Sequence, residues 1–124
     1  MKIWLDEPDP IYISNSWYNV HESGGWQDEH VHALSRWSIS AYLDVPLNSG
    51  NILFRDPLHE LTRNFTSESS QHPWKIIPVS TGDVLIFPSW LRHKTEVCKS
   101  ADRRLIWSLN VGYETAVSEP VLHL

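Results

Sequence analysis

Two histidines, His30 and His32, stand one residue apart in the stretch DEHVH, directly after Asp28 and Glu29. In a helix, residues i and i+2 point to nearly opposite sides, whereas in a strand they point to the same side, about 7 Å apart at their Cα atoms. The pair can therefore share a metal ion only if this stretch is extended. Imidazole nitrogens suit iron, zinc, copper and nickel, so these metals are the candidates.

A third ligand must come from elsewhere, and His93 is the best candidate. It follows a turn at Gly82, an apolar run and a stop at Pro88, in the segment GDVLIFPSWLRHKTEV. Three protein ligands leave coordination positions open, as a catalytic metal site requires. Any one histidine alone is more simply explained as a hydrogen-bonded surface or core residue, but the combination favours a metal. Asp28, which shares strand parity with His30 and His32, is the alternative ligand if the site contains a carboxylate.

The segments that position these residues are short and end at turn-forming residues, as is typical of a β protein. RWSISAYLDVP, residues 36–46, alternates between an apolar and a polar set and ends at a proline, which predicts a strand. Further strands are predicted for NILF, WKIIPV, VLIFP and RRLIWSLNVGY, giving seven or eight in total without a long helix. We therefore expect one all-β domain over residues 1–124, built as an antiparallel sandwich or barrel.

The last predicted strand carries the second set of candidate residues. Alternation places Arg104, Ile106, Ser108 and Asn110 on one face, which we expect to line the interior. The other face, with Leu105, Trp107 and Leu109, is the expected core-packing face.

One long segment, residues 57–74, shows little periodicity apart from a predicted helical turn in LHELTRNF. Long loops in compact domains are often functional. We therefore expect residues 57–74 to form a lid or a substrate loop.

Composition favours a soluble, cytoplasmic protein. The single cysteine, Cys98, excludes an internal disulfide and predicts a reduced compartment, and no apolar run approaches the ~18 residues of a membrane span. The net charge of -5 argues against a nucleic-acid partner. The seven tryptophans are expected to fill a small core. Any that prove exposed would favour a homodimer.

Several motifs in order carry a family resemblance. SWYNVHESGGWQDEHVHALSRWSISAYLDVPLNSGNILFRDP, then IPVSTGDVLIFPSWLRH, then RRLIWSLNVGY resemble the 2-oxoglutarate- and Fe(II)-dependent oxygenases found in phages and marine bacteria. The resemblance extends from about Ser16 to Gly112. It implies a double-stranded β-helix, a jelly-roll barrel of the cupin-like type whose open end holds iron.

The resemblance also implies roles for individual residues. His30 and His93 take the two histidine positions of the iron site, and Arg104 takes that of the arginine that pairs with the far carboxylate of 2-oxoglutarate. A planar guanidinium suits that task because it grips a carboxylate through two hydrogen bonds. Tyr42 is a second donor to the same carboxylate, and Ser108 faces the same interior.

The implied cofactors are Fe(II) and the co-substrate 2-oxoglutarate. The implied reaction is hydroxylase-type oxidation of a C–H bond in a small molecule or peptide, with release of succinate and CO2. Two positions depart from the wider superfamily. His32 stands where an acid is usual, so the iron centre would be one unit more positive, and Ile106 stands where many oxygenases place a serine.

Two other functions fit the same fold. The spacing Gly24, five residues, His30-Val-His32, and later Gly82, five residues, Pro88, then His93 also resembles the cupin pattern. A cupin-type metalloenzyme or small-molecule binder would not use 2-oxoglutarate, and it would have no need of an inward Arg104. The third alternative is a jelly-roll module that binds without catalysis.

Overall fold

The computed structural model describes residues 11–62 and 72–113. These residues form seven strands: β1 (Ile11–His21), β2 (Trp37–Asp44), β3 (Ile52–Arg55), β4 (Trp74–Ile77), β5 (Val84–Pro88), β6 (His93–Thr95) and β7 (Arg104–Tyr113). Within the same ranges the one helix is α2 (His59–Thr62), which lies where the single helical turn was predicted. Most of the remaining expected lid, residues 63–71, lies outside the described residues.

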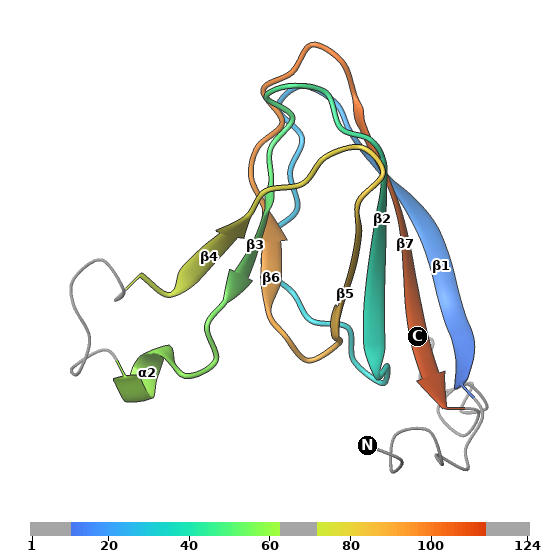
Figure 1. The fold of residues 1–124 in the computed structure, drawn as a ribbon, viewed down its shortest axis with the longest axis vertical. Helices are drawn as coiled ribbons and strands as arrows, with labels where there is room; N and C mark the ends of the chain where they lie inside the picture. The colour runs from blue at the N-terminus through green and yellow to red at the C-terminus, as the bar shows by residue number, and fades with distance from the viewer. Residues whose placement is uncertain (1–10, 63–71, 114–124) are drawn as a thin grey trace.

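The strands form two antiparallel sheets that stand as separate layers (Figure 1). The major sheet has the order β1-β7-β2-β5, and the minor sheet has the order β4-β3-β6. Strands far apart in sequence are neighbours, since β7 pairs with both β1 and β2. This is the double-stranded β-helix that the resemblance implied, and the all-β prediction is confirmed.

The buried face of the major sheet is its polar face. In the pairing of β2 with β7, Ser38 lies opposite Asn110, and Ser40 lies opposite Ser108. All four side chains are buried, as are Tyr42, Ile106 and Arg104 of the same face. The alternation predicted on both strands is therefore confirmed, and the face with Arg104 lines the interior as expected.

The expected core-packing face of β7 is on the opposite, outer side of the sheet. Leu109 is buried, but Leu105 is only partly buried and Trp107 is 38% exposed. That expectation was wrong for most of the face because alternation shows which residues share a side, whereas only the position of the second sheet shows which side is covered.

The hydrophobic core between the sheets is small. It consists of Tyr42, Ile52, Val79, Phe87 and Ile106, with partly buried side chains packed around them. None of the six described tryptophans is buried, and Trp26, Trp90 and Trp107 are exposed. The expectation that they fill the core is therefore wrong, because serine, histidine, arginine and asparagine side chains occupy many of the interior positions instead. Cys98 is buried.

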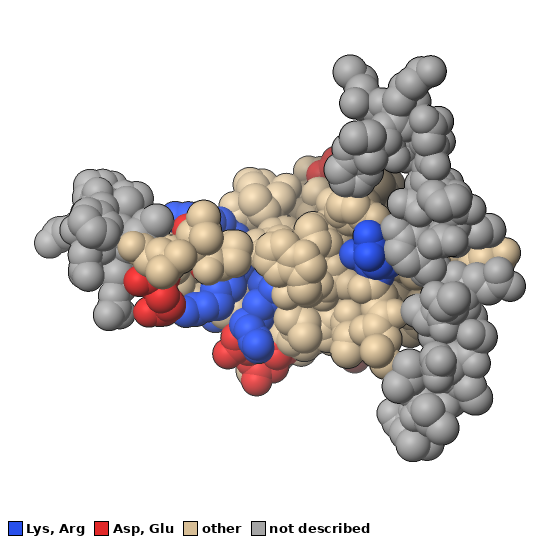
Figure 2. Space-filling view, turned by 90° about the horizontal axis from the view of Figure 1, so that it is seen from below, with Lys and Arg blue, Asp and Glu red and all other residues tan. Residues whose placement is uncertain are grey.

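Charged side chains are unevenly distributed over the face of the molecule seen in Figure 2. Figure 2 shows most of them on the side that carries α2 and the minor sheet, with mainly uncharged surface toward the major sheet. Nothing helical within residues 11–62 and 72–113 has the length and apolar character needed to cross a membrane.

Candidate metal centre and buried arginine

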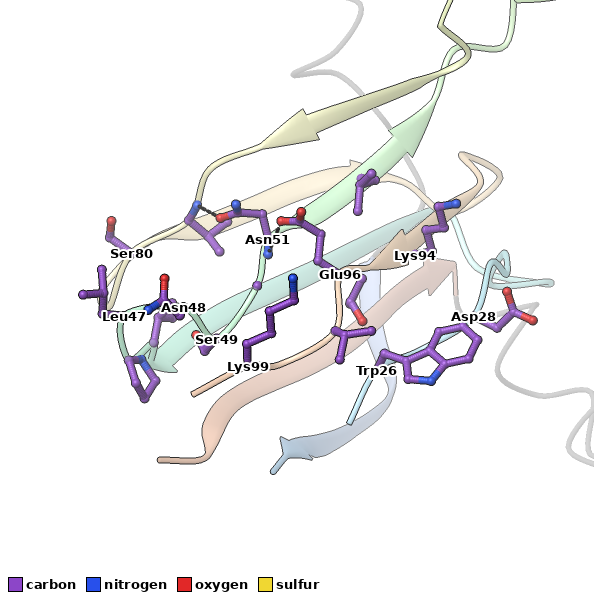
Figure 3. Close-up of a pocket in the computed structure, with 17 residues that line it drawn as sticks. Trp26, Asp28, Leu47, Asn48, Ser49, Asn51, Ser80, Lys94, Glu96 and Lys99 are labelled. Atoms are coloured by element: carbon purple, nitrogen blue, oxygen red, sulfur yellow. Dashed lines mark hydrogen bonds between the residues drawn. The ribbon is translucent and has the colours of Figure 1, made fainter. Parts of the chain in front are cut away.

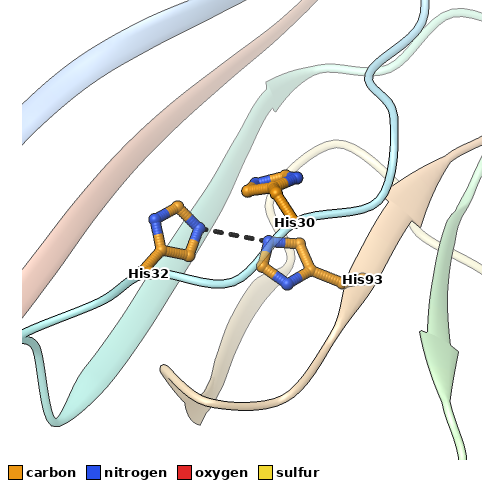
Figure 4. A group of neighbouring side chains, drawn as sticks. All are labelled: His30, His32 and His93. Atoms are coloured by element: carbon orange, nitrogen blue, oxygen red, sulfur yellow. Dashed lines mark hydrogen bonds between the residues drawn. The ribbon is translucent and has the colours of Figure 1, made fainter.

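The three predicted histidine ligands lie together between the two sheets (Figure 4). The segment that carries His30 and His32 is extended and runs beside β6. An extended segment is what the two histidines need in order to share a metal ion. His30 forms an isolated antiparallel bridge with His93, through backbone hydrogen bonds of 3.0 and 3.1 Å. The backbone N–H of His32 donates to the carbonyl of Ser89 at 2.9 Å. Backbone pairing thus brings together histidines that are 61 residues apart in sequence.

Their ring nitrogens are arranged as a metal site needs. One ligand atom from each of the three residues lies within 4.8 Å of the others, and the Nε2 atoms of His32 and His93 are 3.1 Å apart. The Nδ1 atom of His30 is 2.8 Å from the carbonyl oxygen of Asp28, and that of His93 is 2.9 Å from the carbonyl oxygen of Leu91. An Nδ1–H that donates to a carbonyl leaves Nε2 free to bind a metal, which is the usual arrangement of metal-binding histidines.

Asn110 connects His32 to the interior polar network. Its Nδ2 atom lies 3.4 Å from Nδ1 of His32, while its Oδ1 accepts a hydrogen bond from Ser38 at 2.9 Å. The hydroxyls of Ser38 and Ser89 are 3.0 Å apart. These contacts restrict the orientation of the His32 ring. Asn110 was placed on the interior face by alternation, but its contact with His32 was not predicted.

Burial keeps two of the three imidazoles neutral at neutral pH. Desolvation is the largest cause that lowers the pKa of His32 and of His93 from 6.5 to about 4, and the neighbouring histidines add to it. A neutral imidazole has the lone pair that a metal ion requires.

The aromatic rings of Phe87 and Phe54 pack against His93, at centroid distances of 4.8 and 6.0 Å, and form an apolar wall.

The carboxylate of Asp28 is not part of this group. The side chain is exposed, and its Oδ1 accepts a hydrogen bond from the backbone of Glu29 at 2.7 Å. Asp28 instead borders a hollow of about 900 Å³ on the outer side of the minor sheet, together with Lys94, Glu96 and Lys99 (Figure 3). None of the three clustered histidines lines that hollow. What the structure brings together at the candidate metal centre is three imidazoles.

Arg104, the first residue of β7, is a buried cation. It is 1% exposed, and burial lowers its pKa, yet a guanidinium keeps its proton in proteins. Its Nη1 donates to the carbonyl of Gly50 at 2.6 Å, its Nη2 donates to Nδ1 of His21, and its Nε has no partner. Among the described residues it forms no ion pair with a carboxylate. A buried charge without a counter-ion is costly, so this position suits an incoming anion.

Tyr42 and Ser108, the other two candidate cofactor residues, face the same interior. Tyr42 is 2% exposed, and burial raises its pKa to about 12, against the opposing effect of Arg104. It therefore keeps its phenolic proton and can donate it in a hydrogen bond. The hydroxyl of Ser108 already accepts a hydrogen bond from Asn19 at 2.8 Å.

A cavity of about 30 Å³ connects the two parts of the site. Its lining includes the three clustered histidines, Tyr42, Ser108 and His21, but not Arg104 itself. This volume is close to that of one water molecule, so a larger ligand enters only if a side chain moves. His21 is the side chain placed to do so, because it both lines the cavity and covers the Arg104 guanidinium.

His21 and Gly50 are site residues that the motifs did not reveal. His21 is the register partner of Arg104 across β1 and β7, which only the pairing of those strands shows. Gly50 has a φ of +93°, and a Cβ atom there would lie 3.1 Å from Nη1 of Arg104. The sequence NSG at residues 48–50 is typical of a turn, but it gives no sign of the arginine beside Gly50.

Comparisons with known proteins show the family and the fold of the chain. Residues 15–110 match the family model of the 2OG-Fe(II) oxygenases. No curated protein matches the chain at a significant level.

Solved structures share the fold at low sequence identity. An oxidoreductase of the 2OG-Fe(II) oxygenase family from Burkholderia pseudomallei has a TM-score of 0.68 at 11% identity, covering 90% of this chain and 49% of that one. HygX from Streptomyces hygroscopicus, solved with nickel and 2-oxoglutarate bound, has a TM-score of 0.60 at 14% identity, covering 84% and 58%. The α-ketoglutarate-dependent epimerase SnoN from nogalamycin biosynthesis has a TM-score of 0.63 at 14% identity, covering 83% and 47%.

The chain thus spans about half the length of these solved structures. The family match covers β1 from Asn15, both segments that carry the clustered histidines, and β7 through Asn110. On this match, the chain belongs to the 2OG-Fe(II) oxygenase family.

Proposed function

We propose that this chain is an Fe(II)- and 2-oxoglutarate-dependent oxygenase of the hydroxylase type. His30, His32 and His93 would hold the iron, and Arg104 with Tyr42 would hold the distal carboxylate of 2-oxoglutarate. The observation that carries the proposal is the presence, in one barrel interior, of three converging imidazoles and a buried arginine that forms no ion pair with a described carboxylate.

The residues present fit both groups. The Nδ1 atoms of His30 and His93 are engaged by backbone carbonyls, so their Nε2 atoms are available to a metal. An all-histidine set leaves the centre one unit more positive than two histidines with one carboxylate, which favours binding of a dianion. Iron bound there supplies, with 2-oxoglutarate and dioxygen, the chemistry that oxidises a substrate C–H bond and releases succinate and CO2.

The protein's own residues bind and orient. The Arg104 guanidinium offers its unpartnered Nε–H, and its Nη2–H becomes available when His21 turns away. The Tyr42 hydroxyl forms no hydrogen bond within the described residues, so its proton is free for the same carboxylate. Phe54 and Phe87 keep water from one side of His93.

The second candidate is a metal-binding jelly roll that does not use 2-oxoglutarate. Two observations favour it: Arg104 already donates to Gly50 and His21, and the cavity has room for about one water molecule. In this alternative Arg104 is a structural residue, and the three histidines bind a metal for another reaction or for binding alone.

The two candidates differ in their response to 2-oxoglutarate. With Fe(II) under anaerobic conditions, we expect 2-oxoglutarate to produce a visible charge-transfer absorption in the wild-type protein, and His30→Ala to lose it together with the metal. Arg104→Met should weaken 2-oxoglutarate binding about 100-fold, as expected for removal of one partner of a buried charge pair. Metal affinity should be retained in that variant because Arg104 forms no hydrogen bond with any of the three clustered histidines.

Arg103→Met is the matched control, since Arg103 is adjacent in sequence but exposed. Tyr42→Phe removes one hydroxyl with little change of shape, and should weaken binding about 10-fold. If the wild-type protein binds iron and 2-oxoglutarate leaves its spectrum unchanged, the second candidate replaces the first. An equal loss in Arg103→Met and Arg104→Met would remove the role given to Arg104.

A further inference from the structure

The outer face of the major sheet is apolar and uncovered by the described residues. Antiparallel partners point to the same side of a sheet, so the residues opposite Leu105 and Trp107 share their outward direction. On β1 these partners are Val20 and Tyr18, and on β2 the partner of Trp107 is Ala41. On β5, Ile86 continues the row from Ile39. All four strands of the sheet therefore present apolar side chains outward.

Seven large side chains of this outer face are exposed: Ile13, Tyr18, Val20, Leu43, Val84, Ile86 and Trp107. Tyr18 and Ile86, on the two opposite edge strands, are each 64% exposed. Aromatic side chains present about 150–250 Å² each and aliphatic ones about half of that, so the seven leave about 500 Å² of apolar side chain in water. This is near the upper end for a soluble monomer.

The distribution of polar and apolar residues on the two faces of the major sheet is that of a sheet covered by other structure on both sides. Its inner face carries serines, an asparagine, an arginine and only part of a small core, while its outer face is mostly apolar, with Ser16 and Asp44 as polar exceptions opposite Leu109 and Leu105. A sheet normally buries its apolar face against another layer of structure. In the part of the chain that the structure describes, no element packs there, because the minor sheet lies on the inner side and α2 lies beside the minor sheet (Figure 1).

We propose that a second copy of this chain covers this face, forming a two-fold symmetric dimer in which two major sheets pack face to face. The exposed apolar side chains of the face supply about 500 Å² per copy, which is more than half of the ~800 Å² per partner of a stable interface, and the half-buried Trp37, Ile39, Leu105 and Val111 add to it. Aligned sheets pack about 10 Å apart with interdigitating side chains, so a flat apolar sheet is complementary to itself. A two-fold axis parallel to the strands would set the β5 edge of one copy opposite the β1 edge of its partner, so that Ile86 faces the strand that carries Tyr18.

The test is the molar mass of the whole chain, measured by light scattering and sedimentation from about 1 to 200 μM. The wild-type protein is expected to be a dimer that dissociates on dilution. Ile86→Lys places a charge on the face of each copy and should weaken the dimer about 100-fold or more. Tyr18→Glu, on the opposite edge strand, should do the same, and mixing the two variants should restore part of the association.

Leu47→Lys is the matched control, because Leu47 is 87% exposed but lies in the turn after β2 rather than on the sheet face. It should leave the dimer unchanged. Metal binding should be the same in all four proteins, which shows that the barrel is intact in each. A wild-type monomer at every concentration overturns the proposal and indicates another cover for the face. A dimer that persists in both Ile86→Lys and Tyr18→Glu overturns it as well.

Discussion

At the scale of single residues, Arg104 and the groups around it decide how the site is understood. The arginine is buried, donates to a backbone carbonyl and to His21, and keeps one N–H unpartnered. The residues around the guanidinium must therefore leave enough space for it. Gly50 is the neighbour on which this depends most, because its backbone approaches the guanidinium directly.

Gly50→Ala is expected to destabilise the protein and to weaken 2-oxoglutarate binding. The positive φ costs a non-glycine residue about 1–2 kcal/mol, and the new Cβ would lie 3.1 Å from Nη1 of Arg104 and 3.0 Å from the carbonyl oxygen of Glu96. Gly24→Ala is the control, because Gly24 also has a positive φ but has no atom within 4 Å of such a Cβ. Urea denaturation of both variants measures the difference. Equal losses of stability would show that contact with the arginine adds nothing.

At the scale of elements, the short strands supply the site by alternation. β5 is the simplest case. Phe87 points inward, where it is part of the core and packs against the ring of His93, whereas Ile86 points outward. The same alternation on β7 directs Arg104 and Ser108 inward and Trp107 outward. Each strand therefore contributes separately to the site and to the outer face.

Phe87→Ala should cost about 3–5 kcal/mol of unfolding free energy, as expected for a buried phenylalanine with aromatic contacts to Phe54 and His93. Ile86→Ala, on the same strand but 64% exposed, should cost less than about 1 kcal/mol at concentrations where the protein is monomeric. Denaturant titration at low protein concentration measures both. Similar losses in the two variants would contradict the inward and outward assignment on β5.

At the scale of the whole molecule, two thin sheets enclose an interior that is more polar than a typical core. Three histidines and an arginine occupy positions that apolar residues would otherwise fill. Stability therefore depends on keeping the imidazoles neutral, and seven of the exposed large apolar side chains of the described residues lie on the outer face of the major sheet.

The metal-free protein should lose stability as the pH falls from about 6.5 to about 4. The pKa values of His32 and His93 are about 4 in the folded protein and 6.5 when unfolded, so in this window the unfolded chain binds more protons. Their contribution is fully present above pH 6.5 and is lost as the pH falls through the folded values. Urea denaturation at several pH values measures how the unfolding free energy changes with pH. A His32→Gln/His93→Gln variant should show a smaller change over this range. An unchanged slope would contradict the assignment.

The sequence alone determined what depends on local periodicity and ordered motifs. It predicted β2, β3, β4, β5 and β7, the shared face of Arg104, Ser108 and Asn110, and the extended geometry of His30 and His32, because side-chain direction along a strand follows from its period of two. The family followed in the same way, since several motifs recur in order over most of the chain.

Only the tertiary structure decided which side of each strand is covered and which distant residues meet. The tryptophans were misjudged for that reason: hydrophobicity favours burial, but no second layer lies over the outer face in the described part of the chain. The contact of His21 with Arg104 joins residues 83 apart, and that of Asn110 with His32 joins residues 78 apart. Such contacts depend on strand pairing across the sheet, which no local pattern encodes.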